Sequence, residues 1–279
     1  MDLSKIYPPR PSWVHKGNFG SVLVVCGSKL YTGSAVFAAV SAVRSGADLV
    51  TVCAPQRAAD AAASALPDLM TYPLKGDYLS TRNISDILDT AHLRKVNSAV
   101  IGCGLGRRVT TFGAIQKLIG KLNVPMVLDA DALRAIAHRP QTVFGKQVIL
   151  TPHAFELAIL LGQDKLPDDF EARLEAAKQA AYKFRAVVLL KGFVDIITDG
   201  TTTITNNTGS PYMTKGGFGD TLSGIVGALL ARGVGLFEAA HAAAYINGRA
   251  GELASKEKGE GVAASDIFEY ISEVISDKG

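Results

Sequence analysis

The sequence has little cysteine, a single tryptophan and no long apolar run. Only three cysteines, Cys26, Cys53 and Cys103, occur in 279 residues, and no pair of them has the spacing of a zinc or redox motif. Their positions at or near the ends of apolar runs predict buried, reduced thiols. No segment approaches the roughly 18 uninterrupted apolar residues of a membrane span, which excludes a membrane-spanning helix.

Charge and composition narrow the class of protein further. The chain carries 29 basic and 26 acidic residues, a net charge of +3, without the clustered basic runs of a nucleic-acid surface, so we expect no nucleic-acid partner. Apolar residues make up 48% and charged residues 20%, which is typical of a folded globular protein. The N-terminal segment "MDLSKIYPPRPSWVHKG" has no apolar signal region, so we expect a cytoplasmic protein with no membrane partner.

Short β-rich runs alternate with alanine-rich helical runs through the first two thirds of the chain. "SVLVVCG" precedes "SAVFAAVSAVRSG", and "DLVTVCAP" precedes "RAADAAASAL", a pattern typical of parallel strands joined by helices. The same pattern predicts strands over 98–104, 125–131 and 146–152, and helices over 110–121, 154–161 and 169–184, with a short helix ending near 137.

The pattern changes after residue 185. "AVVLLKG", "DIITDG" and "TTTITN" predict three short strands separated only by "FV" and the Asp199-Gly200 pair, which indicates an antiparallel edge. Helices are predicted over 217–232, 236–255 and 264–276. The fold class is therefore α/β, with a mostly parallel central sheet flanked by helices on both faces and an antiparallel edge. Because no repeat or linker divides the chain, we expect one domain spanning 1–279.

The stretch "KGGFGDTLSG" combines a bare backbone with the start of a helix. Gly216, Gly217 and Gly219 lack a Cβ, so their N–H groups can approach a ligand closely. The N-terminus of the following helix favours an anion at the same point, and phosphate is the expected occupant. Asp220 would repel that phosphate, so it needs another role. It either caps the helix or accepts the proton of a substrate hydroxyl during phosphoryl transfer.

"GGFGD" resembles the anion-hole motif of the ribokinase-like superfamily. The accompanying segments are similar to one branch of it, the ADP- or ATP-dependent NAD(P)H-hydrate dehydratases, and they follow the order of that family over nearly the whole chain. These segments are "HKGNFGSVLVVCGSKLYTGSA" (15–35), "GCGLGR" (102–107), "VLDADAL" (127–133), "LTPHAFE" (150–156), "KGFVDII" (191–197) and "GSPYMTKGGFGDTLSG" (209–224).

The resemblance implies a ribokinase-like fold and a lyase that repairs nicotinamide cofactors. In such an enzyme a phosphoryl group from ADP or ATP is transferred to the hydroxyl of hydrated NADH or NADPH, and phosphate then leaves to restore NADH or NADPH. Adenine nucleotide and hydrated cofactor are the implied partners, with ADP the favoured nucleotide and Mg²⁺ the implied metal. The resemblance also implies a homo-oligomer, because similar proteins form tetramers. The apolar segment "FEAAHAAAYINGRAGELA" (237–254) packs either in the core, which we favour, or against another subunit.

The resemblance also assigns site residues. It implies that Asp220 is the general base and contacts the substrate, and that Glu156 holds magnesium through water. The implied nucleotide-binding residues are Lys191, Gly192, Phe193, Val194, Asp195, Gly216, Gly217 and Gly219. The implied substrate-binding residues are Ser34, which stands where the family commonly has alanine, and Gly104, Gly106 and His153.

Several of these residues have simpler interpretations. Lys191 could equally be an exposed lysine at the end of a strand. His153 could be a polar group whose hydrogen bonds are satisfied at the start of a helix. Gly104 and Gly106 fit an ordinary strand-to-helix turn, and Arg107 stands where the third glycine of GxGxxG belongs, which disfavours a Rossmann dinucleotide site. Asp129 and Asp131 follow a strand and either line a site or cap a helix.

Two other functions are compatible with "GGFGD". One is an ordinary ribokinase-like kinase for a small alcohol, which would not explain "YTG", "TPHAFE" and "KGFVDI" together. The other is a nucleotide sensor without catalytic activity, against which the intact Asp220 argues.

Overall fold

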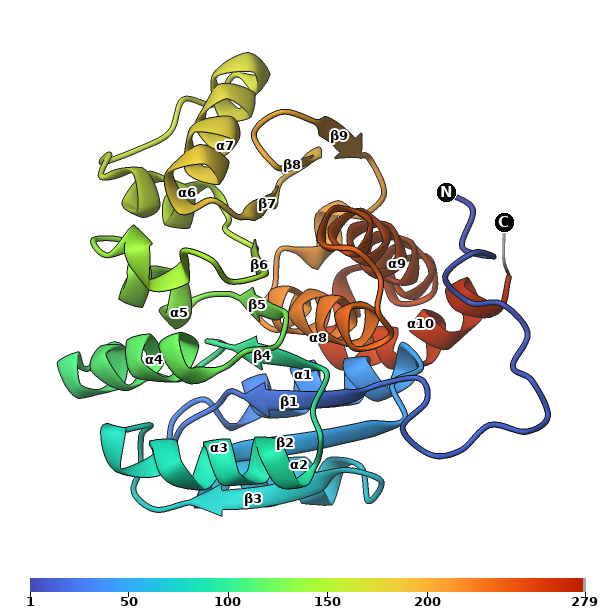
Figure 1. Ribbon diagram of the computed structural model, residues 1–279. Helices are drawn as coiled ribbons and strands as arrows, with labels where there is room; N and C mark the ends of the chain where they lie inside the picture. The colour runs from blue at the N-terminus through green and yellow to red at the C-terminus, as the bar shows by residue number, and fades with distance from the viewer. Residues whose placement is uncertain (278–279) are drawn as a thin grey trace.

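A nine-stranded sheet forms the centre of the computed structural model, which describes residues 1–277 (Figure 1). The strand order is β3-β2-β1-β4-β5-β6-β7-β8-β9. Strands β1 to β7 are parallel, whereas β8 is antiparallel to β7 and β9 to β8. The strands are β1 (Ser21–Val25), β2 (Leu49–Pro55), β3 (Met70–Leu74), β4 (Ser98–Ile101), β5 (Met126–Leu128), β6 (Val148–Leu150), β7 (Val187–Leu190), β8 (Asp195–Thr198) and β9 (Thr203–Asn206). The predicted parallel sheet with an antiparallel edge is confirmed.

Helices cover both faces of this sheet. One apolar core joins one face to α1, α2, α8, α9 and α10, and a second core joins the other face to α3, α4, α5, α6 and α7. The helices are α1 (Thr32–Arg44), α2 (Gln56–Ala65), α3 (Ile84–Leu93), α4 (Val109–Lys121), α5 (Asp131–Ile136), α6 (Ala154–Leu161), α7 (Phe170–Phe184), α8 (Phe218–Ala231), α9 (Leu236–Lys258) and α10 (Ile267–Ser276). Positions 278 and 279 of the predicted domain lie outside the described residues.

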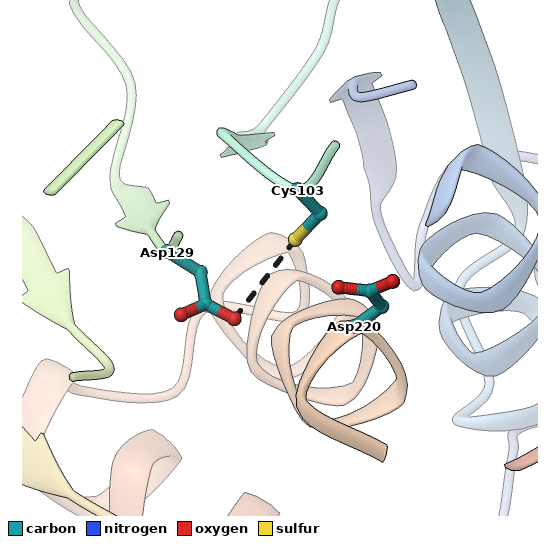
Figure 2. Close-up of side chains that lie close together, drawn as sticks. All are labelled: Cys103, Asp129 and Asp220. Atoms are coloured by element: carbon teal, nitrogen blue, oxygen red, sulfur yellow. Dashed lines mark hydrogen bonds between the residues drawn. The ribbon is translucent and has the colours of Figure 1, made fainter. Parts of the chain in front are cut away.

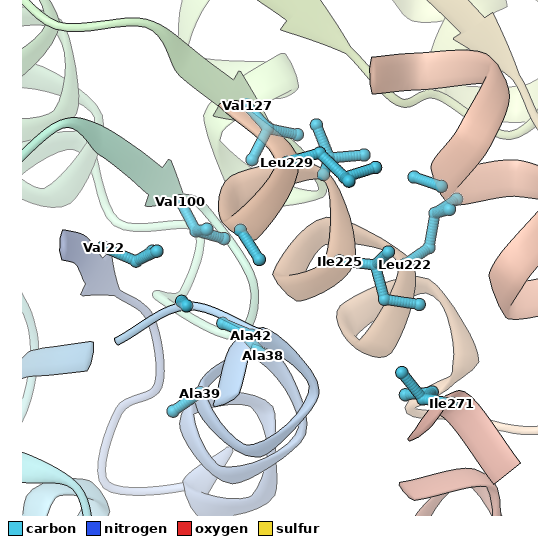
Figure 3. Close-up of a cluster of buried hydrophobic side chains, with 14 of the residues drawn as sticks. Val22, Ala38, Ala39, Ala42, Val100, Val127, Leu222, Ile225, Leu229 and Ile271 are labelled. Atoms are coloured by element: carbon cyan, nitrogen blue, oxygen red, sulfur yellow. The ribbon is translucent and has the colours of Figure 1, made fainter. Parts of the chain in front are cut away.

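The two cores follow from the alternation of side chains along each strand. Val22 and Val24 face one core, and Leu23 and Val25 face the other. All four are fully buried, as expected for parallel strands covered on both faces. Figure 3 shows the first core, in which strand valines meet side chains of α8 and the small alanines of α1.

Helix α8 lies deep in the first core because its small residues allow close approach. A Cβ at Gly224 would lie 2.1 Å from the backbone oxygen of Ala38 in α1, and a Cβ at Gly227 would lie 2.4 Å from a methyl carbon of Val100. These contacts clamp α8 between α1 and the sheet. The start of α8 is therefore held firmly at the carboxyl edge of the parallel strands.

Two elements were missed by the sequence patterns. Strand β3 is a partly exposed edge strand that contains Pro73, so it lacks both the apolar run of a buried strand and a full ladder of donors. Helix α3 follows it and was also not predicted. Helix α9 buries its small apolar residues in the first core, which agrees with the core interpretation of segment 237–254. Within residues 1–277, no helix is long and apolar enough to cross a membrane.

Candidate functional site

The site lies at the carboxyl edge of the sheet, next to the point where the strand order reverses. The chain leaves β1 toward β2 and β3 on one side, and returns to add β4 to β9 on the other. Crevices at such reversal points are the usual ligand sites of open α/β sheets. Here a cavity of about 800 Å³ is lined by residues after β5, β6 and β7, by segment 207–217 and by the first turn of α8. Its size suits a nucleotide-sized ligand.

Helix α8 begins with the glycine-rich segment. Gly217 is the N-cap residue and has φ +104°, a conformation that favours glycine. The helix begins at Phe218, so Asp220 is its third residue and does not cap it. The capping interpretation of Asp220 is therefore wrong. Gly216, Gly217 and Gly219 all line the cavity, where the unpaired N–H groups of a first helical turn favour an anion.

Asp220 lies among other ionisable groups. The Cys103 thiol and the carboxylates of Asp129 and Asp220 each have a ligand atom within 4.8 Å of the others (Figure 2). Burial, followed by the negative charge of Asp129, raises the pKa of Asp220 to about 6, although interactions with Ser34 and Cys103 act in the opposite direction. A carboxylate with this pKa is a stronger base than an exposed aspartate and is still ionised at neutral pH.

Asp129 and Lys191 form an ion pair beside Asp220. The Lys191 Nζ lies 2.9 Å from the Asp129 Oδ1, and the Ser223 hydroxyl donates to the Asp129 Oδ2 at 2.9 Å. Burial alone would lower the pKa of Lys191, but the carboxylates of Asp129 and Glu156 raise it above its ordinary value. Lysine 191 therefore keeps its charge next to the cavity. Its side chain is only 21% exposed, so the interpretation as an exposed strand-end lysine is wrong.

Gly219 lies where these groups meet. A Cβ at this position would lie 3.3 Å from the Lys191 Nζ and 3.6 Å from the Asp129 Oδ2. The glycine leaves room for a ligand oxygen next to the lysine. Asp129 lines the cavity and accepts the N–H of Ala130 at 2.8 Å, whereas the N-cap of α5 is Ala130 itself. Of its two interpretations, a lining residue is the one observed.

The turn between β7 and β8 forms another wall of the cavity. Gly192, Phe193 and Asp195 line it, whereas Val194 is not among the lining residues. Asp195 accepts the Gly192 N–H and the Asn206 amide, each at 3.0 Å, which fixes the turn. The Phe193 side chain is 92% exposed. An exposed aromatic ring at the rim of a cavity is suited to stacking on a planar ligand.

His153 and Glu156 start helix α6 with reciprocal hydrogen bonds. The His153 Nδ1 accepts the Glu156 N–H at 3.3 Å, and the Glu156 Oε2 accepts the His153 N–H at 3.0 Å. His153 is thus a satisfied polar group at a helix start, and it also lines the cavity. Burial is the main cause that lowers the pKa of His153 and raises that of Glu156.

Ser34, Gly104 and Gly106 are not among the lining residues of the cavity, whereas Asp220 lines the cavity and also interacts with Ser34. A Cβ at Gly104 would lie 2.7 Å from the Ser34 Oγ, so these two residues are in close contact. The Gly106 N–H donates to the Asp131 Oδ2 at 2.7 Å, which makes Asp131 a support for this loop. Asp220 therefore stands between the predicted nucleotide residues and the predicted substrate loop.

The sequence did not identify Cys103 and Ser223 as site residues. Cys103 follows β4 and points toward Asp129, with its Sγ 3.9 Å from the Asp129 Oδ2 (Figure 2). Ser223 is one helical turn after Asp220. The available signal for both was position, because Cys103 follows the carboxyl end of a parallel strand and Ser223 shares a helix face with Asp220.

Comparisons with known proteins identify relatives along the whole chain. A family model described as NAD(P)H-hydrate dehydratase matches residues 22–273. The bifunctional NAD(P)H-hydrate repair enzyme Nnr of Methanothermobacter thermautotrophicus is 39% identical over 98% of this chain and 53% of its own length. The chain thus spans about half the length of this and other bifunctional relatives. The ADP-dependent (S)-NAD(P)H-hydrate dehydratase of Cenarchaeum symbiosum is 39% identical, over 98% of this chain and 94% of its own.

Solved structures agree with the fold. The ADP/ATP-dependent NAD(P)H-hydrate dehydratase of Bacillus subtilis, co-crystallized with ATP and Mg²⁺, aligns with a TM-score of 0.81 at 25% identity, over 99% of this chain and 96% of that chain. A ribokinase-like superfamily protein of Enterococcus faecalis aligns with a TM-score of 0.80 at 22% identity, over 97% and 92% of the two chains. The predicted ribokinase-like fold is confirmed.

Proposed function

The chain belongs to the NAD(P)H-hydrate dehydratase family, and from this premise we propose that it uses ADP or ATP to dehydrate hydrated NADH and NADPH to NADH and NADPH. The observation that carries the proposal is the position of Asp220. This carboxylate, with its pKa raised to about 6, lies at the glycine-rich start of α8, between the 800 Å³ cavity and the Ser34–Gly104 contact. A base that bridges a phosphate site and a hydroxyl site is the arrangement that phosphoryl transfer to an alcohol requires.

The adenine nucleotide occupies the large cavity in this proposal. Its terminal phosphate lies against Gly216, Gly217 and Gly219, where a first helical turn offers N–H donors. The Lys191 ammonium, held beside the same point by Asp129, neutralises charge on the transferred group. The turn 192–195 contacts the remainder of the nucleotide, with Phe193 at the rim and Asp195 fixing the backbone of Gly192.

The hydrated nicotinamide ring lies on the Ser34–Gly104 side of Asp220. Its ring hydroxyl attacks the terminal phosphorus of the nucleotide, and Asp220 accepts the hydroxyl proton while the bond to the leaving nucleotide breaks. The ring nitrogen lone pair then expels inorganic phosphate, and the adjacent ring carbon loses a proton to restore the double bond. With ADP the balanced products are NADH or NADPH, AMP and phosphate. Hydroxide alone is a poor leaving group, which explains the need for a nucleotide.

Magnesium fits the chemistry of the cavity. Glu156 is buried and lines the cavity with Asp129 and Asp220, and carboxylate oxygens with water are the ligands that Mg²⁺ prefers. We assign Glu156 to hold the ion through water, where it would neutralise charge on the nucleotide phosphates. His153 donates its backbone N–H to the Glu156 carboxylate and lines the cavity; in this proposal it contacts the substrate where the hydrated ring meets the nucleotide phosphate.

ADP is the favoured nucleotide in this proposal, because the relative from Cenarchaeum symbiosum, which matches this chain over nearly its full length, is named ADP-dependent.

We treat residues 1–279 as one domain, and we assign the reaction to the cytoplasm, where reduced nicotinamide cofactors circulate. A homo-oligomer, such as a tetramer, is part of the same proposal.

The test is substitution of the base. Asp220→Asn keeps the shape of the side chain but cannot accept the proton, so nucleotide affinity should change less than about threefold while turnover falls at least about 100-fold. Asp164 is an exposed carboxylate far from Asp220 in the sequence. Asp164→Asn is therefore the matched control and should leave nucleotide affinity and turnover unchanged. Turnover that survives in Asp220→Asn would show that another group is the base. Phosphorylation of a simple alcohol without cofactor repair would favour the kinase alternative, and nucleotide binding without any turnover the sensor.

A further inference from the structure

A second cavity, of about 460 Å³, lies outside the site described above. It is formed by the segment after β3, by the start of α3 and by the start of α4. Its lining residues are Lys75, Gly76, Asp77, Tyr78, Leu79, Ser80, Arg82, Asn83, Asp86, Arg108 and Thr110. Segment 75–80 follows the carboxyl end of β3, and Arg108 follows the loop at the carboxyl end of β4. The second cavity therefore lies at the same edge of the sheet as Asp220.

Uncompensated positive charge distinguishes this cavity. Lys75, Arg82 and Arg108 are exposed, and none of them forms an ion pair within residues 1–277. Of the two lining carboxylates, Asp77 is paired with Lys29 at 2.9 Å, and only Asp86 remains to offset the three cations. The Arg108 guanidinium lies 3.8 Å from the centre of the Tyr78 ring, a stacking contact that restricts its orientation. Guanidinium groups suit a phosphate dianion, because each can donate two parallel hydrogen bonds to its oxygens.

The second cavity is connected to the proposed substrate loop by direct contacts. A Cβ at Gly106 would lie 2.9 Å from the Tyr78 ring, and a Cβ at Gly104 would lie 2.7 Å from the Cβ of Tyr31. The backbone N–H of Lys29 donates to the backbone carbonyl oxygen of Asp77 at 2.9 Å. The loops after β1, β3 and β4 thus form one continuous wall from Asp220 to the second cavity.

The length of this wall matches a dinucleotide. Strands β4 and β3 are separated by β1 and β2, so their carboxyl ends lie about 14 Å apart at the usual strand spacing. An extended dinucleotide covers this distance. With the nicotinamide ring beside Asp220, the adenosine half of the molecule reaches the cluster of Lys75, Arg82 and Arg108.

We propose that the second cavity binds the phosphate-bearing adenosine end of the hydrated cofactor, with Arg82 and Arg108 contacting the ribose 2′-phosphate. The protein consequently prefers hydrated NADPH to hydrated NADH. This inference rests on the proposed function for the identity of the substrate. It adds a specificity site that lies outside the motifs from which the function was argued.

The binding test compares NADP⁺ with NAD⁺ at saturating ADP, so that the large cavity is filled. Calorimetry should give the wild-type protein a dissociation constant at least about tenfold lower for NADP⁺, since a charge-assisted contact contributes this much. Arg82→Gln and Arg108→Gln should each remove most of that difference and leave NAD⁺ affinity within about twofold. Lys121→Gln, at the far end of α4, has the same charge change and should behave as wild type. Equal affinity of wild type for both ligands, or equal weakening of both by the arginine variants, would overturn the inference.

The turnover test separates this inference from the proposed function. Wild type with ADP should have a lower KM for hydrated NADPH than for hydrated NADH, and both arginine variants should raise the first KM with little effect on kcat. Turnover of both substrates without preference leaves the proposed function intact and refutes the specificity site. If neither substrate is converted with ADP or ATP, the proposed function fails, and the NADP⁺ and NAD⁺ dissociation constants still decide whether the cavity recognises the 2′-phosphate.

Discussion

The raised pKa of Asp220, the proposed catalytic base, predicts that its ionised carboxylate destabilises the fold. The pKa rises from 3.8 to about 6, chiefly through burial and the charge of Asp129. Each unit corresponds to about 1.4 kcal/mol, so the ionised carboxylate costs up to about 3 kcal/mol at neutral pH. Because the side chain is only partly buried, we expect Asp220→Asn to raise the free energy of unfolding by about 1–3 kcal/mol at pH 8.

The sign of the pH dependence follows from proton binding. Between pH 3.8 and about 6 the folded protein binds the Asp220 proton more tightly than the unfolded chain does, so stability falls as pH rises through this window. The penalty is fully present above about pH 6 and absent below the unfolded pKa. The increase in the free energy of unfolding caused by Asp220→Asn should therefore be largest at pH 8 and should vanish near pH 4.

Urea denaturation of the ligand-free protein at these two pH values measures the effect. The exposed carboxylate of Asp164 provides the control, since Asp164→Asn should change the free energy of unfolding by less than about 0.5 kcal/mol. The reasoning is refuted if Asp220→Asn destabilises the protein at pH 8, or if its gain is the same at both pH values.

Three further predictions concern the same site. With Asp220 as the base, kcat/KM should fall about tenfold per pH unit below about pH 6. Asp129→Asn removes a negative charge that raises the pKa of Asp220, so in a pH profile this decrease of kcat/KM should begin at a lower pH. Lys191→Met should lower the free energy of unfolding by about 3 kcal/mol in urea titrations, because it leaves the buried Asp129 unpaired; recovery in the double variant with Asp129→Asn checks the cause. Gly217→Ala should lower the free energy of unfolding by about 2–4 kcal/mol, because φ is +104° and the new Cβ would lie 2.7 Å from the Cβ of Ala264. Gly216 has open space around it, so Gly216→Ala should lower the free energy of unfolding by less than about 1 kcal/mol.

Local patterns were sufficient for much of the fold. The alternation of apolar strands and alanine-rich helices is a property of neighbouring residues, so it predicted the parallel sheet, and the short runs after residue 185 predicted its antiparallel edge. Strand β3 was missed because an edge strand with Pro73 and exposed side chains carries little of that pattern. Helix α3 was also missed, although its buried residues Ile84, Ile87 and Ala91 recur at helical spacing.

Site residues that are neighbours in the sequence could be predicted, whereas contacts between residues far apart in the sequence could not. The glycines before Asp220 lie close together in the chain, and the structure places them at the start of α8 as expected. The pairing of Asp129 with Lys191 joins residues 62 positions apart, and it depends on the order of β5, β6 and β7 in the sheet. The second cavity depends in the same way on β3 and β4 sharing one edge. Sequence spacing carries no information on such contacts, whereas strand order decides them.

The most direct measurement follows the oxygen of the substrate hydroxyl. Hydrated NADH labelled with oxygen-18 at the ring hydroxyl is incubated with the protein and ADP, and the released phosphate and the water are analysed by mass spectrometry. Transfer of a phosphoryl group to the hydroxyl before elimination predicts that the label is found in inorganic phosphate, in step with the return of reduced-nicotinamide absorbance. Label found in water, with unlabelled phosphate, would contradict phosphorylation of the hydroxyl and with it the assigned role of Asp220.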